Sequence, residues 1–122
     1  MTQELHNKLE YEKRPWGSYT VLEEGTNYKV KKIDVLPNHR LSYQKHTYRE
    51  EYWTIVSGNG IITLDGTKTS IKTGDTLHVP MQMLHRIENT GTELLRFIEV
   101  QLGSYLGEDD IIRVDDDYGR KQ

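Results

Sequence analysis

The sequence contains no cysteine and no alanine, and it has only one phenylalanine and three prolines among its 122 residues. The absence of cysteine excludes disulfide bonds and thiolate metal sites, and it is typical of a cytoplasmic protein. Alanine is the residue that favours helices most strongly, so its absence argues against a helix bundle.

Long apolar runs are also missing. The longest extend over only a few residues, such as Ile61–Ile62 and Phe97–Ile98, so no segment is expected to span a membrane. The first six residues contain no apolar segment of the kind found in secretory signals. The net charge of −3 and the pI of about 5.9 lack the basic excess of a nucleic-acid-binding surface. We therefore expect a cytoplasmic protein whose partners are neither membranes nor nucleic acids.

Residues that suit a pleated strand are abundant, with 12 Thr, 9 Ile, 7 Val and 8 Tyr. Short segments rich in these residues alternate with turn signals, of which Asp65-Gly66 is the clearest two-residue hairpin. The predicted strands cover residues 18–23, 28–36, 41–47, 51–56, 60–64, 67–72, 76–79, 85–89 and 93–102. Their spacing predicts an all-β sandwich or barrel.

The length allows one domain with one core. Residues 1–13 show no strand pattern and are predicted to form a flexible N-terminal arm, so that a single domain covers residues 14–122. The stretch from Tyr105 onward is acidic, and we expect it to form a short helical turn and a final strand. Its carboxylate run at 115–117 is interpreted as a solvated tail.

A set of polar residues is expected to meet on one side of the predicted strands. The period of two in a strand places Gln44 and His46 on one face, together with Arg40. Glu51 follows after a tight connection, and His85 opens a later strand, so their side chains can converge with that face. An amide oxygen, two imidazoles and a carboxylate are suitable ligands for a divalent metal.

Basic and acidic residues near this face are candidates for contact with a substrate. Arg40 and Arg49 share the facing of the predicted ligands, and inward arginines need an anionic partner. Lys31 is a further candidate if its strand turns its odd-numbered residues inward. Glu99 is expected to be semi-buried, where the pKa of a carboxyl can rise, and it is the candidate general base. A structural carboxylate paired with an arginine is the open alternative for Glu99.

The spacing of the residues around these positions resembles the cupin family, whose motifs are G-x5-H-x-H-x3–4-E-x6-G and G-x5-P-x-G-x2-H-x3-N. With the same spacings, this chain has Asn38, Gln44, His46, Glu51 and Gly58, followed by Gly74, Pro80, Gln82, His85 and Asn89. Asn38 and Gln82 replace glycines, and Gln44 replaces the first histidine. Asn38 is a mild change because asparagine tolerates left-handed backbone. The resemblance implies a double-stranded β-helix, also called a jelly-roll barrel.

Residues from about 14 to 120 further resemble the type II mannose-6-phosphate isomerase domain, which often forms the C-terminal part of mannose-1-phosphate guanylyltransferases. The segments that carry this resemblance include Arg14-Pro15-Trp16-Gly17, Val56-Ser57-Gly58 and Asp116-Asp117-Tyr118-Gly119-Arg120. The resemblance implies zinc as the metal, a homodimer, and a ligand set of Gln44, His46, Glu51 and His85. The nucleotidyltransferase part is not expected in 122 residues.

We therefore expect a metal-dependent isomerase that interconverts mannose 6-phosphate and fructose 6-phosphate. In this interpretation Glu99 moves the proton, and Arg40, Arg49 and Lys31 hold the phosphate. Two alternatives stay open. One is a small Fe(II) dioxygenase of the cupin type, against which Gln44 as a fourth ligand argues. The other is a non-catalytic cupin that binds a sugar phosphate.

Overall fold

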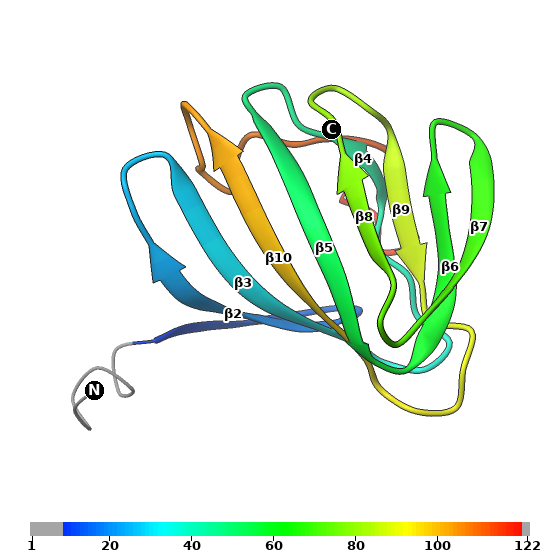
Figure 1. Ribbon diagram of the computed structural model, residues 1–122. Coiled ribbons are helices and arrows are strands. Elements are labelled where there is room, and N and C mark those ends of the chain that lie inside the picture. The colour runs from blue at the N-terminus through cyan, green and yellow to red at the C-terminus, as the bar shows by residue number, and fades with distance from the viewer. Residues whose placement is uncertain (1–8, 121–122) are drawn as a thin grey trace.

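Two antiparallel sheets form the fold of residues 9–120, the part of the chain that the computed structural model describes (Figure 1). The larger sheet has the order β1-β2-β3-β10-β5-β8, and the smaller one has the order β11-β4-β9-β6-β7. The strands are β1 (Glu10–Arg14), β2 (Gly17–Glu24), β3 (Tyr28–Val35), β4 (Tyr43–Lys45), β5 (Arg49–Ser57), β6 (Asn59–Leu64), β7 (Thr67–Lys72), β8 (Thr76–Val79), β9 (His85–Glu88), β10 (Leu95–Gly103) and β11 (Ile112–Asp115). The described residues include no helix that could cross a membrane.

The predicted strands and the predicted hairpin are present. Asp65 and Gly66 connect β6 to β7, and both have positive φ angles, 48° and 88°. Positive φ at both central residues is the requirement of the type I′ turn that suits the twist of a hairpin. The local sequence therefore determines the turn as well as the two strands.

Two expectations about the ends of the chain are corrected. Residues 10–14 form β1, which pairs with β2 from Glu10 opposite Val21 to Arg14 opposite Gly17. The predicted flexible arm is therefore wrong for residues 10–13, whereas residues 1–8 lie outside the described residues. The strand was missed because four of its five side chains are charged, which is common at a sheet edge. The predicted C-terminal helical turn is also wrong, since the described chain has only a turn at 108–109 before the predicted final strand, β11.

One end of the interior between the sheets is apolar. On β10, Phe97 lies opposite Ile33 of β3 and Ile55 of β5, and all three are buried. Phe97 also stacks on Trp53, with ring centroids 4.2 Å apart. These contacts place the hydrophobic core at this end of the larger sheet.

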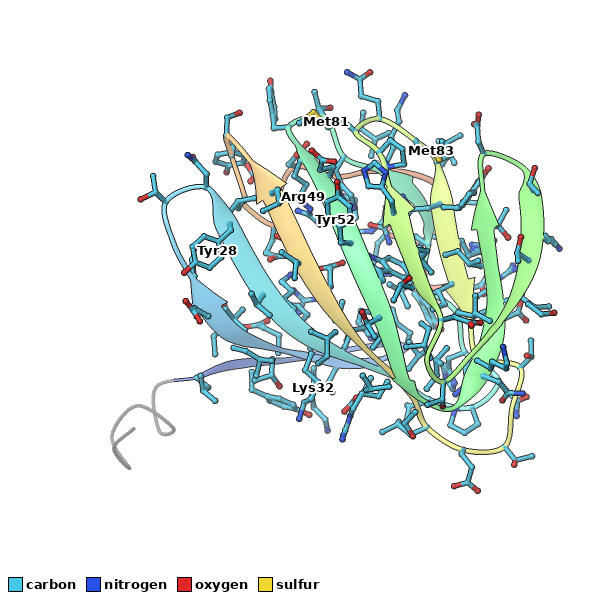
Figure 2. The ribbon with its side chains drawn as sticks, viewed as in Figure 1. Tyr28, Lys32, Arg49, Tyr52, Met81 and Met83 are labelled. Carbon is cyan, nitrogen blue, oxygen red and sulfur yellow. The ribbon has the colours of Figure 1, made fainter. Side chains whose placement is uncertain are left out.

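The same three strands carry polar residues further along the same inward face. Glu99 lies opposite Lys31, and Gln101 lies opposite Lys29 and Glu51, all of them buried. The outer face of β5 is different, because Tyr52 is exposed while the neighbouring inward positions are buried (Figure 2). The strand alternation therefore directs these charged groups into the interior, at one end of the barrel.

Candidate metal centre and its pocket

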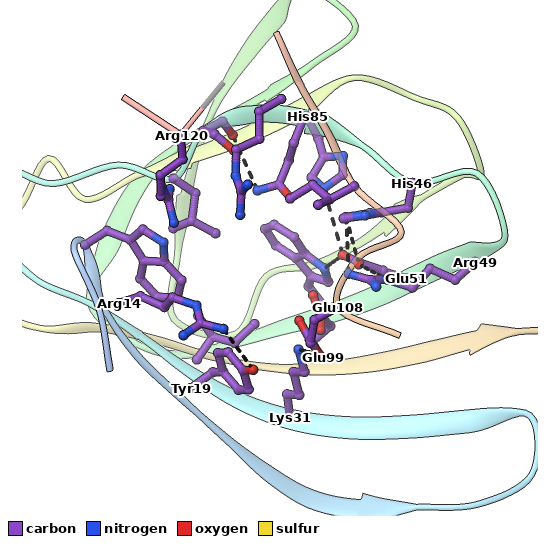
Figure 3. A pocket seen from close by; sticks show the side chains of 18 residues that line it. Arg14, Tyr19, Lys31, His46, Arg49, Glu51, His85, Glu99, Glu108 and Arg120 are labelled. Carbon is purple, nitrogen blue, oxygen red and sulfur yellow. Dashed lines mark hydrogen bonds and ion pairs between the residues drawn. The ribbon is translucent and has the colours of Figure 1, made fainter. Parts of the chain in front are cut away.

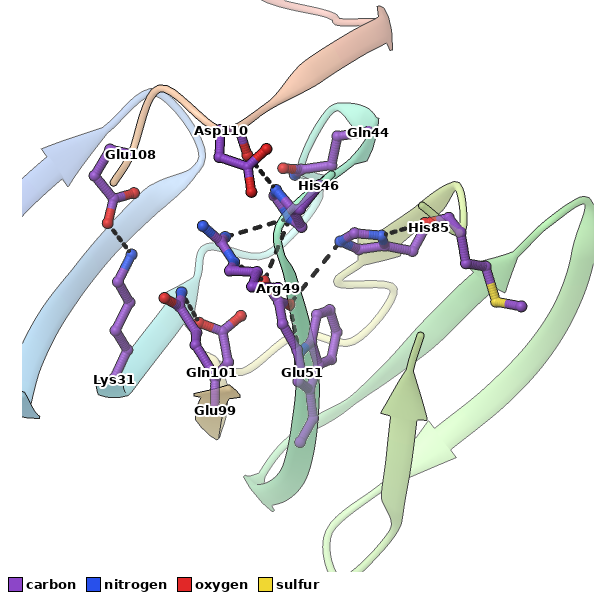
Figure 4. A network of polar contacts seen from close by, with 12 residues as sticks. Lys31, Gln44, His46, Arg49, Glu51, His85, Glu99, Gln101, Glu108 and Asp110 are labelled. Carbon is purple, nitrogen blue, oxygen red and sulfur yellow. Dashed lines mark hydrogen bonds and ion pairs between the residues drawn. The ribbon is translucent and has the colours of Figure 1, made fainter. Parts of the chain in front are cut away.

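Three predicted ligands meet in the interior at the polar end. His46 follows β4 directly, Glu51 belongs to β5, and His85 is the first residue of β9. One potential ligand atom from each residue lies within 4.8 Å of the others, and all three side chains are buried (Figure 4). Two imidazole nitrogens and a carboxylate oxygen at this separation fit a divalent cation.

Backbone carbonyls orient both imidazoles. The Nδ1 atom of His46 lies 2.8 Å from the carbonyl oxygen of Asp110, and Nδ1 of His85 lies 2.9 Å from that of Met83. Because a carbonyl only accepts hydrogen bonds, each Nδ1 carries the proton in a neutral imidazole and each Nε2 presents its lone pair to the cluster. In His46 this lone pair accepts from Arg49 Nη2 at 3.3 Å, a contact that a metal ion would replace. A hydrogen bond from Nδ1 to a carbonyl, which turns Nε2 toward the site, is typical of histidines that bind metals.

The charges around Glu51 favour the protonation states that a metal requires. Its carboxylate accepts hydrogen bonds from Trp53 Nε1 at 2.9 Å and from Arg49 Nε at 2.8 Å. Burial alone would raise the pKa of Glu51, but the neighbouring charge of Arg49 outweighs it and holds the pKa well below its usual range. Burial lowers the pKa of His46 to about 4 and also lowers the pKa of His85. At neutral pH the carboxylate is therefore ionised and both imidazoles are neutral.

Gln44 lies beside this cluster, as predicted. It is buried on β4 and is the cross-strand partner of His85 on β9 (Figure 4). Its Nε2 atom lies 3.5 Å from the carbonyl oxygen of Ser42, which leaves Oε1 as the atom available to a cation.

The cluster forms part of the wall of a pocket with a cavity of about 90 Å³. Arg14 and Arg120 lie on the side of this pocket opposite His46 and Glu51 (Figure 3). Both arginines stand in segments that carry the family resemblance, but neither was predicted as a site residue, because they come from β1 and from the far C-terminal segment. The lining also includes three predicted site residues, Lys31, Arg49 and Glu99.

Lys31 and Glu99, which line the pocket, both have polar partners. Lys31 Nζ donates to Glu108 at 2.6 Å, and Gln101 Nε2 donates to Glu99 at 2.7 Å. Burial, supported by the charge of Glu51, raises the pKa of Glu99 to about 8. Glu99 is thus buried with a raised pKa, as the sequence predicted.

Arg40 does not line the pocket. Its guanidinium donates twice to the carboxylate of Asp117, at 2.7 and 2.9 Å, on a partly exposed surface. The predicted contact between Arg40 and a phosphate is therefore corrected. The interpretation of residues 115–117 as a solvated tail is wrong as well, since Asp115 pairs with Arg86 and Asp116 with Arg120.

Asp110 is a site residue that sequence reasoning missed. It is buried, and its carboxylate accepts hydrogen bonds from the backbone amides of Thr47 and Tyr48, each at 2.9 Å, while its carbonyl orients His46. These partners are more than 60 residues away in the sequence. A local pattern contains no signal for such a contact, because the acidic stretch around Asp110 has the composition of a solvated surface.

Comparisons with known proteins agree with this fold. The family model described as "Mannose-6-phosphate isomerase C-terminal" matches residues 2–116. The alginate biosynthesis protein AlgA of Pseudomonas aeruginosa is 46% identical over 107 residues, which are 88% of this chain and 22% of that protein. The mannose-1-phosphate guanylyltransferase of Escherichia coli is 42% identical over 107 residues, with the same shares. The chain therefore spans less than a quarter of the length of these relatives.

A solved structure from Klebsiella pneumoniae, a protein with a double-stranded β-helix domain, has a TM-score of 0.69 and 22% identity. The similarity covers 77% of this chain and 80% of that one. It confirms the predicted double-stranded β-helix fold of the cupin type.

The relatives correct the predicted activity. They are named for guanylyltransferase activity and for alginate biosynthesis, not for isomerisation. The prediction that this chain interconverts mannose 6-phosphate and fructose 6-phosphate is therefore wrong. The role of Glu99 as the proton-moving base of that reaction is withdrawn with it.

Proposed function

The chain belongs to the mannose-6-phosphate isomerase C-terminal domain family, and on this premise we propose that it is a cupin domain that binds a divalent metal ion and, beside it, a phosphorylated sugar. The observation that carries the proposal is the convergence of His46, Glu51 and His85 within 4.8 Å in a buried pocket. The predicted homodimer stays a prediction.

Zinc is the proposed metal, with Gln44, His46, Glu51 and His85 as the protein ligands. Zinc accepts imidazole nitrogen and carboxylate oxygen, and this chain has no thiolate that would favour softer metals. Arg49 and Trp53 keep the Glu51 carboxylate ionised and oriented. When bound, the metal supplies a positive charge that attracts and polarises ligand oxygens.

The pocket supports a polar ligand next to the metal ligands. Ser42 lies in the lining, and its Oγ atom is buried with no hydrogen-bond partner among the described residues. A buried hydroxyl without a partner is available to a sugar hydroxyl, which both donates and accepts. A phosphorylated sugar is favoured as the class because cationic side chains line the same pocket and a relative is named for mannose 1-phosphate.

The metal proposal is tested by titrating zinc into chelator-treated protein and measuring the heat of binding. We expect one zinc ion per chain, and we expect His46→Ala to weaken binding more than about a hundredfold, since even outer-shell changes cost ten- to a hundredfold. His78→Ala is the matched control, because His78 is exposed and pairs with Glu50 away from the pocket. Unchanged affinity in His46→Ala would overturn the proposed site.

The ligand proposal is tested on the zinc-loaded protein with mannose 1-phosphate, mannose 6-phosphate and free mannose. We expect saturable binding of at least one sugar phosphate and weaker binding of mannose, because the phosphate adds charge-assisted hydrogen bonds. Absence of binding for both phosphates in a protein that takes up zinc normally would leave a metal-binding domain and contradict the sugar phosphate.

A further inference from the structure

Most cationic side chains at the polar end already have an acidic partner. Arg49 pairs with Glu51 at 2.8 Å, and Lys31 pairs with Glu108 at 2.6 Å. A phosphate group at either position would have to compete with a carboxylate that belongs to the protein itself, and at Arg49 that carboxylate is buried. A cationic side chain without a carboxylate partner is therefore better placed to bind a phosphate group.

Arg113 is different. It lies on β11 in the C-terminal segment and lines the pocket. Its Nε atom is buried and has no hydrogen-bond partner within the described part of the chain. A guanidinium is always charged and presents only donors, so a buried Nε–H without an acceptor points to an anion that is bound there in the working protein.

The strand register places Arg113 in line with the metal ligands. Arg113 is the cross-strand partner of Gln44, and Gln44 is the cross-strand partner of His85. Residues directly opposite each other in antiparallel strands share one face, so the three side chains form a row on the inward face of β11, β4 and β9. With strands about 4.8 Å apart, Arg113 lies roughly 10 Å from His85 along the sheet. His85, Gln44 and Arg113 line the same pocket, so a small ligand in it can contact the metal centre and Arg113 together.

Two further arginines line the same side of the pocket. Arg14 donates to Tyr19 Oη at 3.2 Å and pairs with Glu12, while Arg120 pairs with Asp116. Both lie opposite the metal cluster (Figure 3). Burial lowers the pKa of Arg113, and the positive charges of Arg120 and Arg14 add to this effect while Asp116 opposes it. Glu12 and Asp116 form ion pairs with Arg14 and Arg120, whereas Arg113 forms no ion pair within the described residues.

We infer that Arg113, supported by Arg14 and Arg120, forms an anion subsite that takes the phosphate group of the ligand. A guanidinium matches the geometry of phosphate oxygens and donates to two of them at once. The sugar then lies in the pocket beside the metal ligands, with its phosphate toward Arg113. The identity of the sugar rests on the proposed function, whereas the affinity for phosphate does not.

The test compares Arg113→Met with wild type, both loaded with zinc, using inorganic phosphate and mannose 6-phosphate as probes. We expect the variant to bind both probes about tenfold more weakly or worse, because charge-assisted hydrogen bonds are lost. Its zinc affinity stays unchanged, and its melting temperature stays equal or rises because a buried Nε–H without an acceptor is removed. Arg40→Met is the matched control, since Arg40 pairs with Asp117 outside the pocket.

The outcomes separate this inference from the proposed function. Equal phosphate affinity in Arg113→Met and wild type overturns the subsite. Loss of zinc affinity together with phosphate affinity also overturns it, because Arg113 would then act only through the fold. If inorganic phosphate binds through Arg113 but neither mannose phosphate binds better than inorganic phosphate, the subsite stands and the sugar of the proposed function is wrong.

Discussion

The two ends of the interior differ although the same strands build both. Along β10, Leu95 and Phe97 point inward at one end, and Glu99 and Gln101 point inward at the other. The inward side chains of the neighbouring strand β3 change from apolar to charged at the same level. Ile33 is the partner of Phe97, whereas Lys31 is the partner of Glu99. Strand alternation is thus identical in both halves, and the chemistry of the inward positions makes one end a core and the other a site.

The polar end tolerates buried charge because its groups compensate each other. Lys29 and Lys31 pair with the carboxylate of Glu108, at 3.6 and 2.6 Å. Arg49 pairs with Glu51 at 2.8 Å. Buried ion pairs of this kind contribute little net stability, because desolvation offsets much of their attraction. Stability therefore depends mainly on the apolar end, and ligand binding depends on the polar end.

The largest effect is expected at the apolar end. Phe97→Ala removes a fully buried ring that stacks on Trp53, so the free energy of unfolding should fall by about 3–5 kcal/mol. Urea denaturation measures the change, with Leu102→Ala on the exposed face of the same strand as control. A loss in Phe97→Ala no larger than in the control would show that the core lies elsewhere.

Trp53 lies on the boundary between the two ends, so its replacement should affect both. Trp53→Phe keeps an aromatic ring against Phe97 but removes the hydrogen bond to Glu51, at a cost of about 1–3 kcal/mol for the unsatisfied carboxylate oxygen. Zinc affinity should fall about tenfold, as for other outer-shell changes. Trp16→Phe is the matched control, since Trp16 does not bond to Glu51. Stability lost without any change in zinc affinity would contradict the role of Trp53 at the polar end.

The pH dependence of stability should also separate the ends. The pKa of Glu99 is raised to about 8 in the folded protein, so between its ordinary pKa and 8 the folded state binds more protons than the unfolded state. The free energy of unfolding of the metal-free protein should therefore decrease as pH rises, by at most about 1.4 kcal/mol per pH unit. His46 and His85 act in the opposite direction around and below their ordinary pKa of 6.5, so the contribution of Glu99 should be clearest in the upper part of the range from pH 6.5 to 8.

Glu99→Gln is the variant that checks this dependence. It keeps an oxygen that accepts from Gln101 but cannot titrate, so its unfolding free energy should vary less between pH 6.5 and 8. Parallel curves for wild type and Glu99→Gln would exclude Glu99 as the group responsible.

The smallest effect is expected in the turns beyond each end. Gln82 and Asn38 replace motif glycines, and both have left-handed backbone, with φ angles of 63° and 65°. Gln82→Gly should raise the free energy of unfolding by about 0.5–1 kcal/mol, because left-handed backbone is unfavourable for glutamine. Asn38→Gly should gain less, since asparagine tolerates this conformation better. Calorimetric melting temperatures compare the two, and a larger gain at Asn38 would contradict the argument.

Much of this protein was determined by its sequence alone. Composition and alternation predicted the β class, most strands and the inward facing of Gln44, His46, Glu51 and His85, because side-chain direction in a strand follows from a local period of two. The cupin-type fold followed from the resemblance of the spacing around those residues.

Only the tertiary structure decided how the C-terminal segment returns to the barrel. That return brings Asp110 to His46 and Arg113 into the pocket, and it pairs Arg40 with Asp117 on the surface. The partners of Asp110 and Arg40 are separated by more than 60 residues along the chain, so no local pattern specifies them. The alternation of a strand specifies a face, whereas closure of the two sheets decides which charges share that face and which remain without a partner.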